Sequence, residues 1–352
     1  MLLSNELLLK IFGKVIKVKV DIIGGGLGGL SAGISLKKNN KTIKVIVHEK
    51  HKKIGYNHEG RRCGEAHSVL SKWIPDIPKG KSIFNNIRKA ETIVGNKKHE
   101  YTLEIDQAFI LNRQEYIYQL GKNAESLGVI ISTNDKIKTF TELDGDYIID
   151  ASGCPSIVKR ELGLNKGIIG ATYQQTLENS NCFISDTIKV IHSDFGGYFW
   201  IFPRNPLKKE INLGVGSFHI FDYNLKKILE EFKKEQNIEG KINYVTGGLI
   251  PIGIQRPLRY KNILFVGDAG VGAYPLSGQG IYRALISGDQ AGKFLARGNP
   301  NKYAHMMNKI FIRWDLICKN FFLINILFKK INPKLILSSL NHYLDFLKVM
   351  HV

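Results

Sequence analysis

Cysteine is scarce in this sequence, and its spacing excludes several classes of protein. The 352 residues contain four cysteines, Cys63, Cys154, Cys182 and Cys318. No pair is spaced as CxxC, and no zinc-site pattern joins them to the ten histidines. The scarcity argues against a disulfide-stapled scaffold and predicts an intracellular protein with free thiols and no metal site.

Long apolar runs are also lacking. No stretch approaches 18 uninterrupted apolar residues, and the longest candidate, Phe321 to Phe328, contains Asn325. A transmembrane span is therefore not expected. The first 14 residues, MLLSNELLLKIFGK, lack a leading basic region and a small-residue cleavage site, so they do not predict a signal peptide. A cytoplasmic location is expected.

Acidic residues are too few to balance the basic ones. Lys and Arg number 50 against 31 Asp and Glu, which gives a net charge of +19. Such an excess attracts nucleic acid, acidic substrates or an anionic membrane surface, although a general Lys-, Ile- and Asn-rich composition explains it as well. Many lysines are scattered singly and no RNA-binding signature is present, so nucleic acid is not an expected partner.

The first motif that is present is a glycine-rich turn, GGGLGG at positions 24–29. It separates the strand-like run Val15 to Ile23 from Leu30 to Lys38, which has helical spacing. Gly24 allows the tight turn, Gly26 lets the backbone approach a pyrophosphate, and Gly29 permits close packing of helix on strand. The pyrophosphate is expected at the helix N-terminus, where free amides and the helix dipole favour negative charge.

A carboxylate follows at the distance that a dinucleotide site requires. A second strand, predicted at Thr42 to Val47, ends at Glu49, about 20 residues beyond the glycines. Glu49 is placed to accept hydrogen bonds from a ribose diol. A lone GxGxxG is weak, but together with the flanking strand, helix and acid it predicts dinucleotide binding.

A second glycine signature lies roughly 240 residues later. The strand-like run Ile263 to Gly267 delivers Asp268, whose carboxylate suits the ribityl hydroxyls of FAD; an ordinary helix cap is the alternative. Pro275 is expected to fix the loop over the isoalloxazine, and Gly278 and Gly280 to begin a helix aimed at it. The two signatures together indicate the two halves of one FAD site.

The chain between the signatures predicts an inserted sheet. Glu91 to Asp106 is typical of a hairpin around Gly95-Asn96, and Asn112 to Gly128 of an amphipathic helix. Strand-like runs dominate from Gly170 to Val245 and favour an antiparallel sheet. Further elements are expected at 147–153 (strand), 226–236 (helix), 303–328 (a basic, aromatic helix) and 334–349 (a last helix after Pro333).

One of these strands carries three aromatic residues on one face. Tyr198, Trp200 and Phe202 alternate, with Gly196-Gly197 before them and Pro203 after them. Such a stripe belongs either to an ordinary core or to the wall of an apolar cavity, and a cavity of this kind suits a polyprenyl chain.

These motifs together resemble the geranylgeranyl reductase family of flavoproteins, most closely its archaeal members, which saturate the isoprenoid chains of membrane lipids. The resemblance spans roughly Val18 to Gly292 and adds three motifs, in order, to the two glycine signatures. The first is RCGE at Arg62 to Glu65. The second, a YxWxFP strand followed by Gly214-Val215-Gly216, lines the lipid cavity in the family. The third, Gly248-Leu249-Ile250-Pro251, is similar to GGxIP.

The resemblance implies an α/β fold with a Rossmann-type FAD-binding domain of the hydroxybenzoate hydroxylase kind. An antiparallel β substrate domain is inserted into it, and a helical region follows at the C-terminus. The expected FAD-binding domain is discontinuous and comprises residues 15–66, 107–165 and 256–298. The expected substrate domain comprises residues 67–106 and 166–255, and the helical region residues 299–352. Part of that region is expected to lie on an anionic membrane.

The resemblance also implies a reaction, the hydrogenation of trisubstituted alkenes by a hydride from reduced FAD. An isolated alkene has no carbonyl to polarise, so a well-aligned acid must supply the proton. Cys63 is the candidate catalytic residue, with a small buried hydrophobe as the alternative interpretation. Arg62 is expected beside the flavin, and Arg113, at the start of a helix, near the adenosine and ribityl portion; a surface arginine is its alternative. Tyr198, Trp200, Phe202, Pro203 and Gly214 are expected to contact the lipid.

One motif departs from the pattern of related flavoproteins. Ser152 occupies the place where many of them carry an acid that helps to engage NADPH, and no second GxGxxG supplies a nicotinamide domain. Electrons are therefore expected from ferredoxin or another reduced carrier. The alternatives are a flavin monooxygenase and a lipid-binding flavoprotein without catalysis. A diether phospholipid, geranylgeranyl diphosphate and a quinone tail are all compatible substrates.

Overall fold

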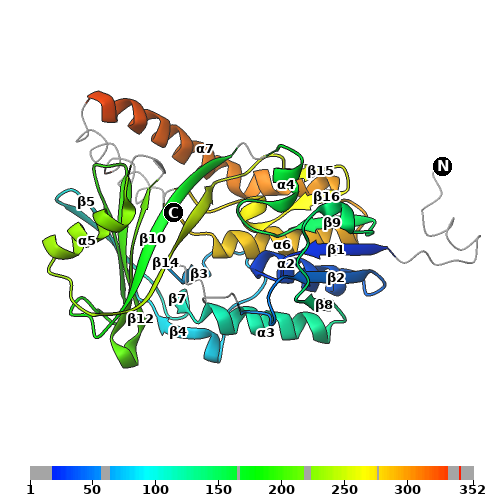
Figure 1. Cartoon of the computed structure of the whole chain (residues 1–352), viewed down its shortest axis with the longest axis horizontal. Coiled ribbons are helices and arrows are strands. Elements are labelled where there is room, and N and C mark those ends of the chain that lie inside the picture. Colours follow the sequence, from blue (N-terminus) through cyan, green and yellow to red (C-terminus); the bar gives the residue numbers. More distant parts are fainter. Residues whose placement is uncertain are drawn as a thin grey trace, which may run out of the picture.

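The computed structural model describes residues 18–56, 64–164, 167–217, 223–275, 277–331 and 341. Within these ranges the strands form three sheets, and Figure 1 shows the two larger ones side by side, with the long helix α7 (Asn301–Ile331) running past both. No helix of the described residues is both long and apolar enough to cross a bilayer.

The first sheet is the nucleotide-binding sheet that the glycine turn predicts. Its order in the described chain is β15 (Arg259–Tyr260), β16 (Ile263–Phe265), β9 (Tyr147–Asp150), β1 (Lys19–Ile23), β2 (Lys44–Glu49) and β8 (Ile130–Thr133). All neighbours pair in parallel except β15 with β16. Carboxyl ends of parallel strands meet at one edge of a sheet, so β1, β9 and β16 deliver their following turns to the same place.

Helices cover both faces of this sheet. On one face α2 (Leu27–Asn39), α3 (Arg113–Ser126), α6 (Ile281–Ala296) and α7 share a core with β1 and β2. On the other face α4 (Ile157–Glu161) packs with Ile148 and Phe265. Helices α2 and α6 lie in close contact because small residues face each other: Ser31 Oγ donates to the carbonyl of Leu285 at 2.7 Å.

The second sheet is the antiparallel layer expected between the signatures. Its order is β14 (Lys241–Ile252), β10 (Ile168–Glu178), β13 (Glu210–Ser217), β12 (Gly197–Asn205), β11 (Thr187–His192), β5 (Lys89–Val94) and β6 (Lys97–Thr102) over the described residues. The β5–β6 hairpin turns at Gly95-Asn96 as predicted, and β5 pairs in parallel with β11. Helix α5 (Leu225–Glu235) packs its Leu229 and Phe232 on the outer face of this sheet.

A small third sheet joins the two layers. It consists of β3 (Ala66–Ser68), β7 (Ala108–Leu111) and β4 (Ile83–Asn86), paired antiparallel. Its strands come from both the expected FAD-binding domain and the expected substrate domain, so the sheet does not mark a boundary between them. The domain boundaries therefore stay a prediction.

The helices and strands expected within the described residues are present, with shifted ends. Helix α2 begins at Leu27, three residues before the expected start, so it includes Gly28 and Gly29. Strand β1 is described from Lys19, and residues 15–17 of its expected range lie outside the described residues. The helix expected at 303–328 is α7, whereas the break at Pro333 and the helix expected at 334–349 lie outside the described residues.

Candidate functional site

The first glycine turn has the geometry of a pyrophosphate site. Gly24 has a φ of +101°, and a Cβ there would lie 2.6 Å from the carbonyl oxygen of Ala151, so glycine is required. A Cβ on Gly29 would overlap the carbonyl of Gly24. A Cβ on Gly26, by contrast, would have no neighbour within 4 Å, and Gly26 is the N-cap of α2. Open space beside the first amides of a helix is what a phosphate group needs.

Glu49 lies against this turn. Its Oε2 accepts a hydrogen bond from the amide of Gly25 at 2.8 Å, and its Oε1 accepts one from the amide of His51 at 2.9 Å. The side chain is buried, and it ends the strand β2 beside β1. The carboxylate is therefore held in a fixed position next to the glycine turn, and its contact with a ribose diol stays a prediction.

The second signature meets the first at the same edge of the sheet. Residues Gly267–Ala269 form a short 3₁₀ turn after β16. The amide of Gly267 donates a hydrogen bond to Ser287 Oγ of α6 at 2.9 Å. A Cβ on Gly28 would lie 3.4 Å from the amide nitrogen of Gly267, so the start of α2 and the Asp268 turn are in contact.

The side chain of Asp268 is accessible to solvent. Protein atoms packed around its carboxyl group nevertheless disfavour the charged form by desolvation and so raise its pKa. The positive charges of Arg113 and Arg283 act on the same carboxyl and lower its pKa in part. Arg113 is the first residue of α3, so the structure brings it to Asp268 from a distant part of the chain. An accessible carboxyl enclosed in this way is available to a polar ligand.

Cys154 is a neighbour of Asp268 that the sequence did not single out. Burial, together with the negative charge of Asp268, raises the pKa of the Cys154 thiol to about 11. The side chain is half-buried and forms no disulfide within the described chain. Cys154 follows β9, whose carboxyl end lies beside that of β16, and this strand order explains a proximity that spacing alone does not suggest.

The loop before α6, described at residues 270–275 and 277–280 and called the cofactor loop below, reaches the antiparallel sheet through Gly278. Its φ is +68°, and a Cβ there would overlap the hydroxyl of Tyr198. Gly280 is the N-cap of α6, and a Cβ on it would lie 3.7 Å from Oδ1 of Asp268. The loop therefore touches the Asp268 carboxylate at one end and the aromatic strand at the other.

The three aromatic residues of β12 share one face, as predicted. The ring centroids of Tyr198 and Trp200 lie 5.9 Å apart, and those of Trp200 and Phe202 lie 6.4 Å apart. Tyr198 and Trp200 are buried, and Trp200 Nε1 donates to Gln174 Oε1 at 3.1 Å. Strand alternation places Pro203 on the opposite face, so Pro203 does not share the surface of the other expected lipid contacts.

Glycines on β13 make room for this aromatic face. Gly214 pairs with Trp200, and a Cβ on Gly214 would overlap the indole ring. At Gly216 the nearest atoms to a Cβ, from Thr172 and Trp200, would be 3.6 Å away, which is ordinary contact. Gly214 is therefore the position at which the ring lies directly on the backbone.

The RCGE segment ends against the same strand. Arg62 and Cys63 lie outside the described residues, and Gly64 and Glu65 are described. A Cβ on Gly64 would lie 2.8 Å from the Phe202 ring. Asn212 Nδ2 donates to the carbonyl of Gly64 at 3.2 Å. The segment that follows Cys63 is thus fixed to the aromatic face of β12 and to β13.

A buried ionic cluster anchors Glu65, and sequence reasoning did not find it. Arg204 Nε donates to Glu65 Oε2 at 2.6 Å, and Arg204 Nη1 donates to Glu210 Oε2. Asn212 Nδ2 also donates to Glu65 Oε2, at 3.2 Å, and the guanidinium stacks 4.1 Å from the Phe84 ring centroid. Arg204 directly follows the FP of the aromatic motif, which is the only signal that the sequence offered.

A second buried ion pair connects α7 to the cofactor loop. Arg283 of α6 donates to both carboxylate oxygens of Asp315 at 2.9 Å, and both side chains are 1% exposed. The same guanidinium donates to the carbonyls of Val271 and Gly272, while Asp315 Oδ2 accepts from the amide of Ile254 at 2.7 Å. Helix α7 therefore holds the segment that leads into Pro275.

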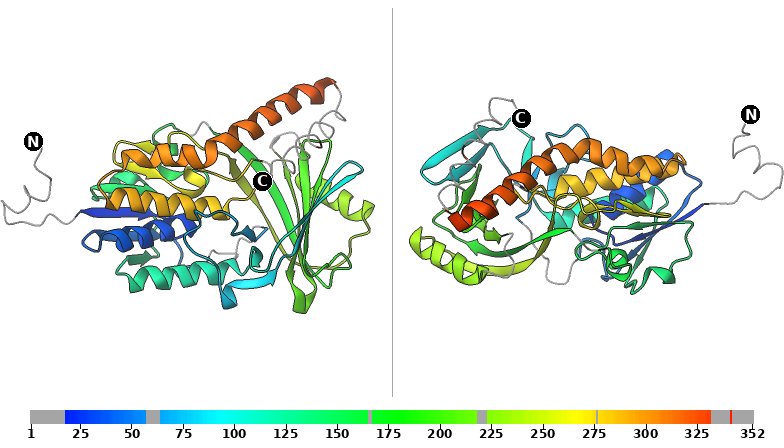
Figure 2. Two further views of the ribbon diagram at one scale, coloured as in Figure 1. Left: turned by 180° about the vertical axis from the view of Figure 1, so that it is seen from behind. Right: turned by 90° about the horizontal axis from the view of Figure 1, so that it is seen from above.

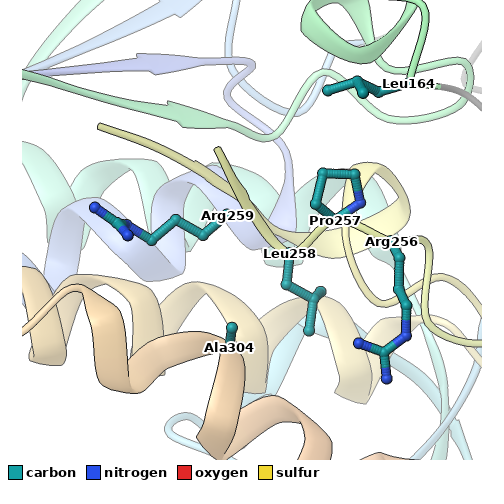
Figure 3. Close-up of a pocket in the computed structure, with 6 residues that line it drawn as sticks. All are labelled: Leu164, Arg256, Pro257, Leu258, Arg259 and Ala304. Atoms are coloured by element: carbon teal, nitrogen blue, oxygen red, sulfur yellow. The ribbon is translucent and has the colours of Figure 1, made fainter. Parts of the chain in front are cut away.

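A cavity of about 470 Å³ lies elsewhere, at the edge strand β15. Figure 3 shows its lining residues, with the Arg256 and Arg259 side chains pointing to opposite sides of Pro257 and Leu258. Leu164 and Ala304 complete the lining. None of the predicted site residues lines this cavity, and its two guanidinium groups do not converge on one ligand.

Comparison with protein families gives a match to the NAD(P)-binding Rossmann-like domain over residues 22–84. This range contains the first glycine turn and Glu49, and it agrees with the fold of the first sheet.

Relatives match over most of the chain. A digeranylgeranylglycerophospholipid reductase of Thermoplasma volcanium is 29% identical over 313 residues, which covers 76% of this chain and 75% of the relative. The crystal structure of a geranylgeranyl bacteriochlorophyll reductase-like protein from Thermoplasma acidophilum superposes with a TM-score of 0.74 at 22% identity, covering 87% of each chain. A flavin-dependent brominase shares the fold with a TM-score of 0.65 at 16% identity, covering 89% of each chain. The resemblance to geranylgeranyl reductases is confirmed.

Proposed function

We propose that this chain is a FAD-dependent reductase that saturates C=C bonds of geranylgeranyl chains in membrane lipids or their precursors. The observation that carries the proposal is the contact between three parts of the site. Gly278 of the cofactor loop and Gly64 of the RCGE segment both pack on the aromatic face of β12. A cofactor bound along Asp268 and an apolar chain bound along Tyr198 and Trp200 would meet at this face.

A flavin dinucleotide fits the residues of the nucleotide-binding sheet. Gly26 leaves open space at the start of α2, Glu49 has a fixed carboxylate beside it, and Asp268 is accessible next to Gly280. We assign the pyrophosphate to the open space beside Gly26 and a ribose diol to Glu49. We assign the ribityl hydroxyls to Asp268, with Arg113 opposite this carboxylate. When bound and reduced, the flavin supplies a hydride. Relatives named as geranylgeranyl reductases support this assignment.

The substrate is assigned to the aromatic side of β12. An isoprenoid chain is recognised by shape and desolvation rather than by hydrogen bonds, and Tyr198, Trp200 and Phe202 present three adjacent rings next to the cofactor loop. Gly214 lets Trp200 lie flat on the sheet. Pro203 is proposed to support this strand from its other face rather than to touch the chain.

In the proposed reaction one alkene carbon would gain a hydride and the other a proton. Two electrons from a reduced carrier and two protons from solvent would then restore the cofactor and the proton donor. Cys63 is the proposed proton donor, because it directly precedes Gly64, which contacts Phe202. Cys154 also holds a proton at neutral pH, since its pKa is raised to about 11. It lies beside Asp268 rather than on the aromatic strand, and we assign it no part in proton transfer.

A reduced carrier such as ferredoxin is the proposed electron donor. Ser152, which stands where related flavoproteins carry an acid, is used internally: its hydroxyl donates to Asp150 Oδ1 at 2.6 Å and accepts from the amide of Ile157 at 2.9 Å. That arrangement caps the turn before α4, and position 152 offers no carboxylate to a nicotinamide cofactor. We further propose a cytoplasmic protein that contacts an anionic membrane surface peripherally.

Mass spectrometry of a geranylgeranyl diether phospholipid tests the function. The lipid is incubated anaerobically with the purified protein and dithionite, and in parallel in air with NADPH. Gain of hydrogen pairs without air is the expected result. Gain of one oxygen atom, only in air, would make the protein a monooxygenase, and binding of FAD and lipid without turnover would make it a lipid-binding flavoprotein.

The Asp268→Ala variant is the matched negative control. It removes the carboxylate that we assign to the ribityl chain and should be purified without the yellow cofactor. The mass of the cofactor released from the unmodified protein decides between FAD and another flavin.

A further inference from the structure

Helix α7 has one face that is fully used by the fold. Tyr303, Met307, Phe311 and Asp315, spaced four residues apart, are each 4% exposed or less. Tyr303 Oη donates to the carbonyl of Phe265 at 2.7 Å, and Asp315 pairs with Arg283, whose guanidinium stacks 4.3 Å from the Phe311 ring centroid. This face fixes α7 rigidly to the nucleotide-binding sheet.

The opposite face of α7 is basic. Its exposed side chains recur every three or four residues and so form one stripe along the helix, which we call the α7 basic face: Lys302, His305, Lys309, Arg313 and Leu316. Asp315, on the buried face, is the one acidic residue in the sequence of α7. The α7 basic face therefore contains no negative side chain of its own.

The position of α7 leaves this face outermost. In the view from above in Figure 2, α7 crosses in front of the nucleotide-binding sheet and continues past the antiparallel sheet. The stripe runs from Lys302 to Leu316 and is therefore about 21 Å long at 1.5 Å per residue. A one-signed stripe of this kind matches an oppositely charged surface.

We propose that the α7 basic face docks the protein on an anionic lipid bilayer. The inference rests on the proposed function, because a membrane lipid as substrate requires the site to reach the membrane. Lysine and arginine side chains next to a bilayer are attracted by anionic headgroups, and each contributes separately. Leu316, 51% exposed among cations, suits the boundary between headgroups and acyl chains.

A bilayer fits these observations better than an acidic protein or nucleic acid does. The sequence that continues α7 beyond the stripe is FFLINILFKK at positions 321–330, in which apolar residues precede two lysines. Apolar and basic residues on one helix are typical of interfacial binding. A phosphate backbone or an acidic protein would use the cations but would gain nothing from an apolar continuation.

The docking helix is coupled to the site by the buried ion pair. Asp315 accepts hydrogen bonds from Arg283 and from the amide of Ile254, and Arg283 holds the carbonyls of Val271 and Gly272 at the base of the cofactor loop. A membrane bound on the outer side of α7 would therefore lie at a fixed position relative to the loop that contacts Tyr198.

Co-sedimentation with lipid vesicles tests the proposal. The full chain is mixed with vesicles of phosphatidylcholine alone or with added phosphatidylglycerol. The protein should bind the anionic vesicles, and the triple variant Lys302→Gln, Lys309→Gln, Arg313→Gln should bind them roughly 100-fold more weakly, at about five-fold per lost cation. These side chains are exposed, so the unfolding temperature should not change.

The control variant removes three lysines from α5: Lys226→Gln, Lys227→Gln and Lys234→Gln. It has the same net charge as the α7 variant and should bind within about three-fold of the unmodified protein, because its cations lie away from the docking face. Equal weakening by both variants, or equal binding to neutral and anionic vesicles, would overturn the proposal.

A third measurement separates this proposal from the proposed function. Dithionite-driven reduction of the lipid in detergent should be unchanged in the α7 variant, because no bilayer is present. If the unmodified protein reduces no lipid in detergent, the proposed function fails while the vesicle result stands. If the variant binds vesicles normally and loses turnover only when ferredoxin replaces dithionite as the reductant, the face docks an acidic carrier and the membrane proposal is wrong.

Discussion

Arg204 and Glu65, 139 residues apart in the chain, form a buried hydrogen-bonded ion pair. The contact joins the end of strand β12, whose aromatic residues are assigned to the lipid, to the end of the RCGE segment, which is expected beside the flavin. These two parts of the site are therefore held together. Glu65 has a φ of +62°, a conformation that non-glycine residues rarely adopt, and its side-chain and backbone hydrogen bonds hold it there.

Replacing Arg204 should therefore destabilise the protein strongly. Arg204→Met removes the cation that pairs with the buried carboxylates of Glu65 and Glu210 in the described chain, and loss of one partner of a buried ion pair costs about 3–5 kcal/mol. Urea unfolding of the apoprotein measures the change. Arg204→Lys should recover part of the stability. Lys208→Ala, which breaks the exposed pair with Glu178, is the control and should have no measurable effect; a similar loss in both variants would show that the cluster is not special.

Two glycines of the first turn should respond differently to alanine. Gly26→Ala adds a methyl group to open space, so the apoprotein should unfold at the same temperature while FAD binds at least ten-fold more weakly. Gly29→Ala would overlap the carbonyl of Gly24 and should lower the unfolding temperature of the apoprotein itself. Fluorescence titration with FAD and thermal unfolding separate the effects. Normal FAD affinity in Gly26→Ala would remove the pyrophosphate from this position.

Gly214→Ala should disturb the aromatic face, because the new methyl group overlaps the indole of Trp200. Overpacking of this kind costs about 1–3 kcal/mol and should displace Trp200, which raises KM for the lipid more than it lowers FAD affinity. Gly216→Ala is the matched control on the same strand, since its nearest neighbours are 3.6 Å away. Steady-state kinetics under anaerobic conditions compare the two. Identical KM values would place the isoprenoid chain elsewhere.

Cys63→Ala should keep FAD bound and lower turnover, because it removes the proposed proton donor and not a cofactor contact of the nucleotide-binding sheet. Single-turnover oxidation of the reduced protein by lipid measures the chemical step directly. Cys182→Ala, in the core beside α5, is the control and should keep the rate. Full activity in Cys63→Ala would exclude Cys63 from the mechanism.

Stability should fall in acid partly because of His67. Its ring is buried, neither nitrogen has a hydrogen-bond partner among the described residues, and burial lowers the pKa to about 4. His67 takes up a proton near pH 6.5 in the unfolded chain but only near pH 4 in the folded chain. The contribution of neutral His67 to the free energy of unfolding is therefore complete above about pH 6.5 and is lost as the pH falls toward 4. At 1.36 kcal/mol per pH unit, the loss reaches about 3 kcal/mol.

The His67→Phe variant checks this assignment. Its unfolding free energy should change less between pH 6.5 and pH 4 than that of the unmodified protein, because phenylalanine binds no proton. His305→Gln, on the exposed side of α7, should leave the acid dependence as it is. An unchanged slope in His67→Phe would contradict the burial argument.

Much of the nucleotide-binding half could be predicted from the sequence, because its motifs are local. The order strand, glycine turn, helix and acid places Gly24, Gly26 and Glu49 within 26 residues, and helix and strand periodicity fixes their relative positions. The aromatic alternation of β12 was predictable for the same reason, since side chains alternate along any strand. Element ends shifted by a few residues, as at α2, because the glycine pattern predicts a turn at residues 28 and 29, where the chain is already helical.

The partners of these motifs could not be predicted. Arg204, Glu210 and Asn212 meet Glu65 only after β12 and β13 pair in one register and the RCGE segment packs on them. In the sequence each is an unremarkable polar residue. Cys154 reaches Asp268 only because β9 and β16 are neighbours in the sheet, and Arg283 meets Asp315 only because α6 and α7 pack face to face.

The sequence by itself determined the strand, glycine turn and helix of the first motif, the aromatic stripe and the resemblance to geranylgeranyl reductases, because each rests on short motifs whose residues lie within one or two turns of helix or a single strand. Only the tertiary structure decided which loop touches which strand: Gly278 on Tyr198, Gly64 on Phe202 and Glu65 on Arg204. Those contacts depend on sheet order and domain packing, in which residues more than 70 positions apart become neighbours, and periodicity carries no information about such distances.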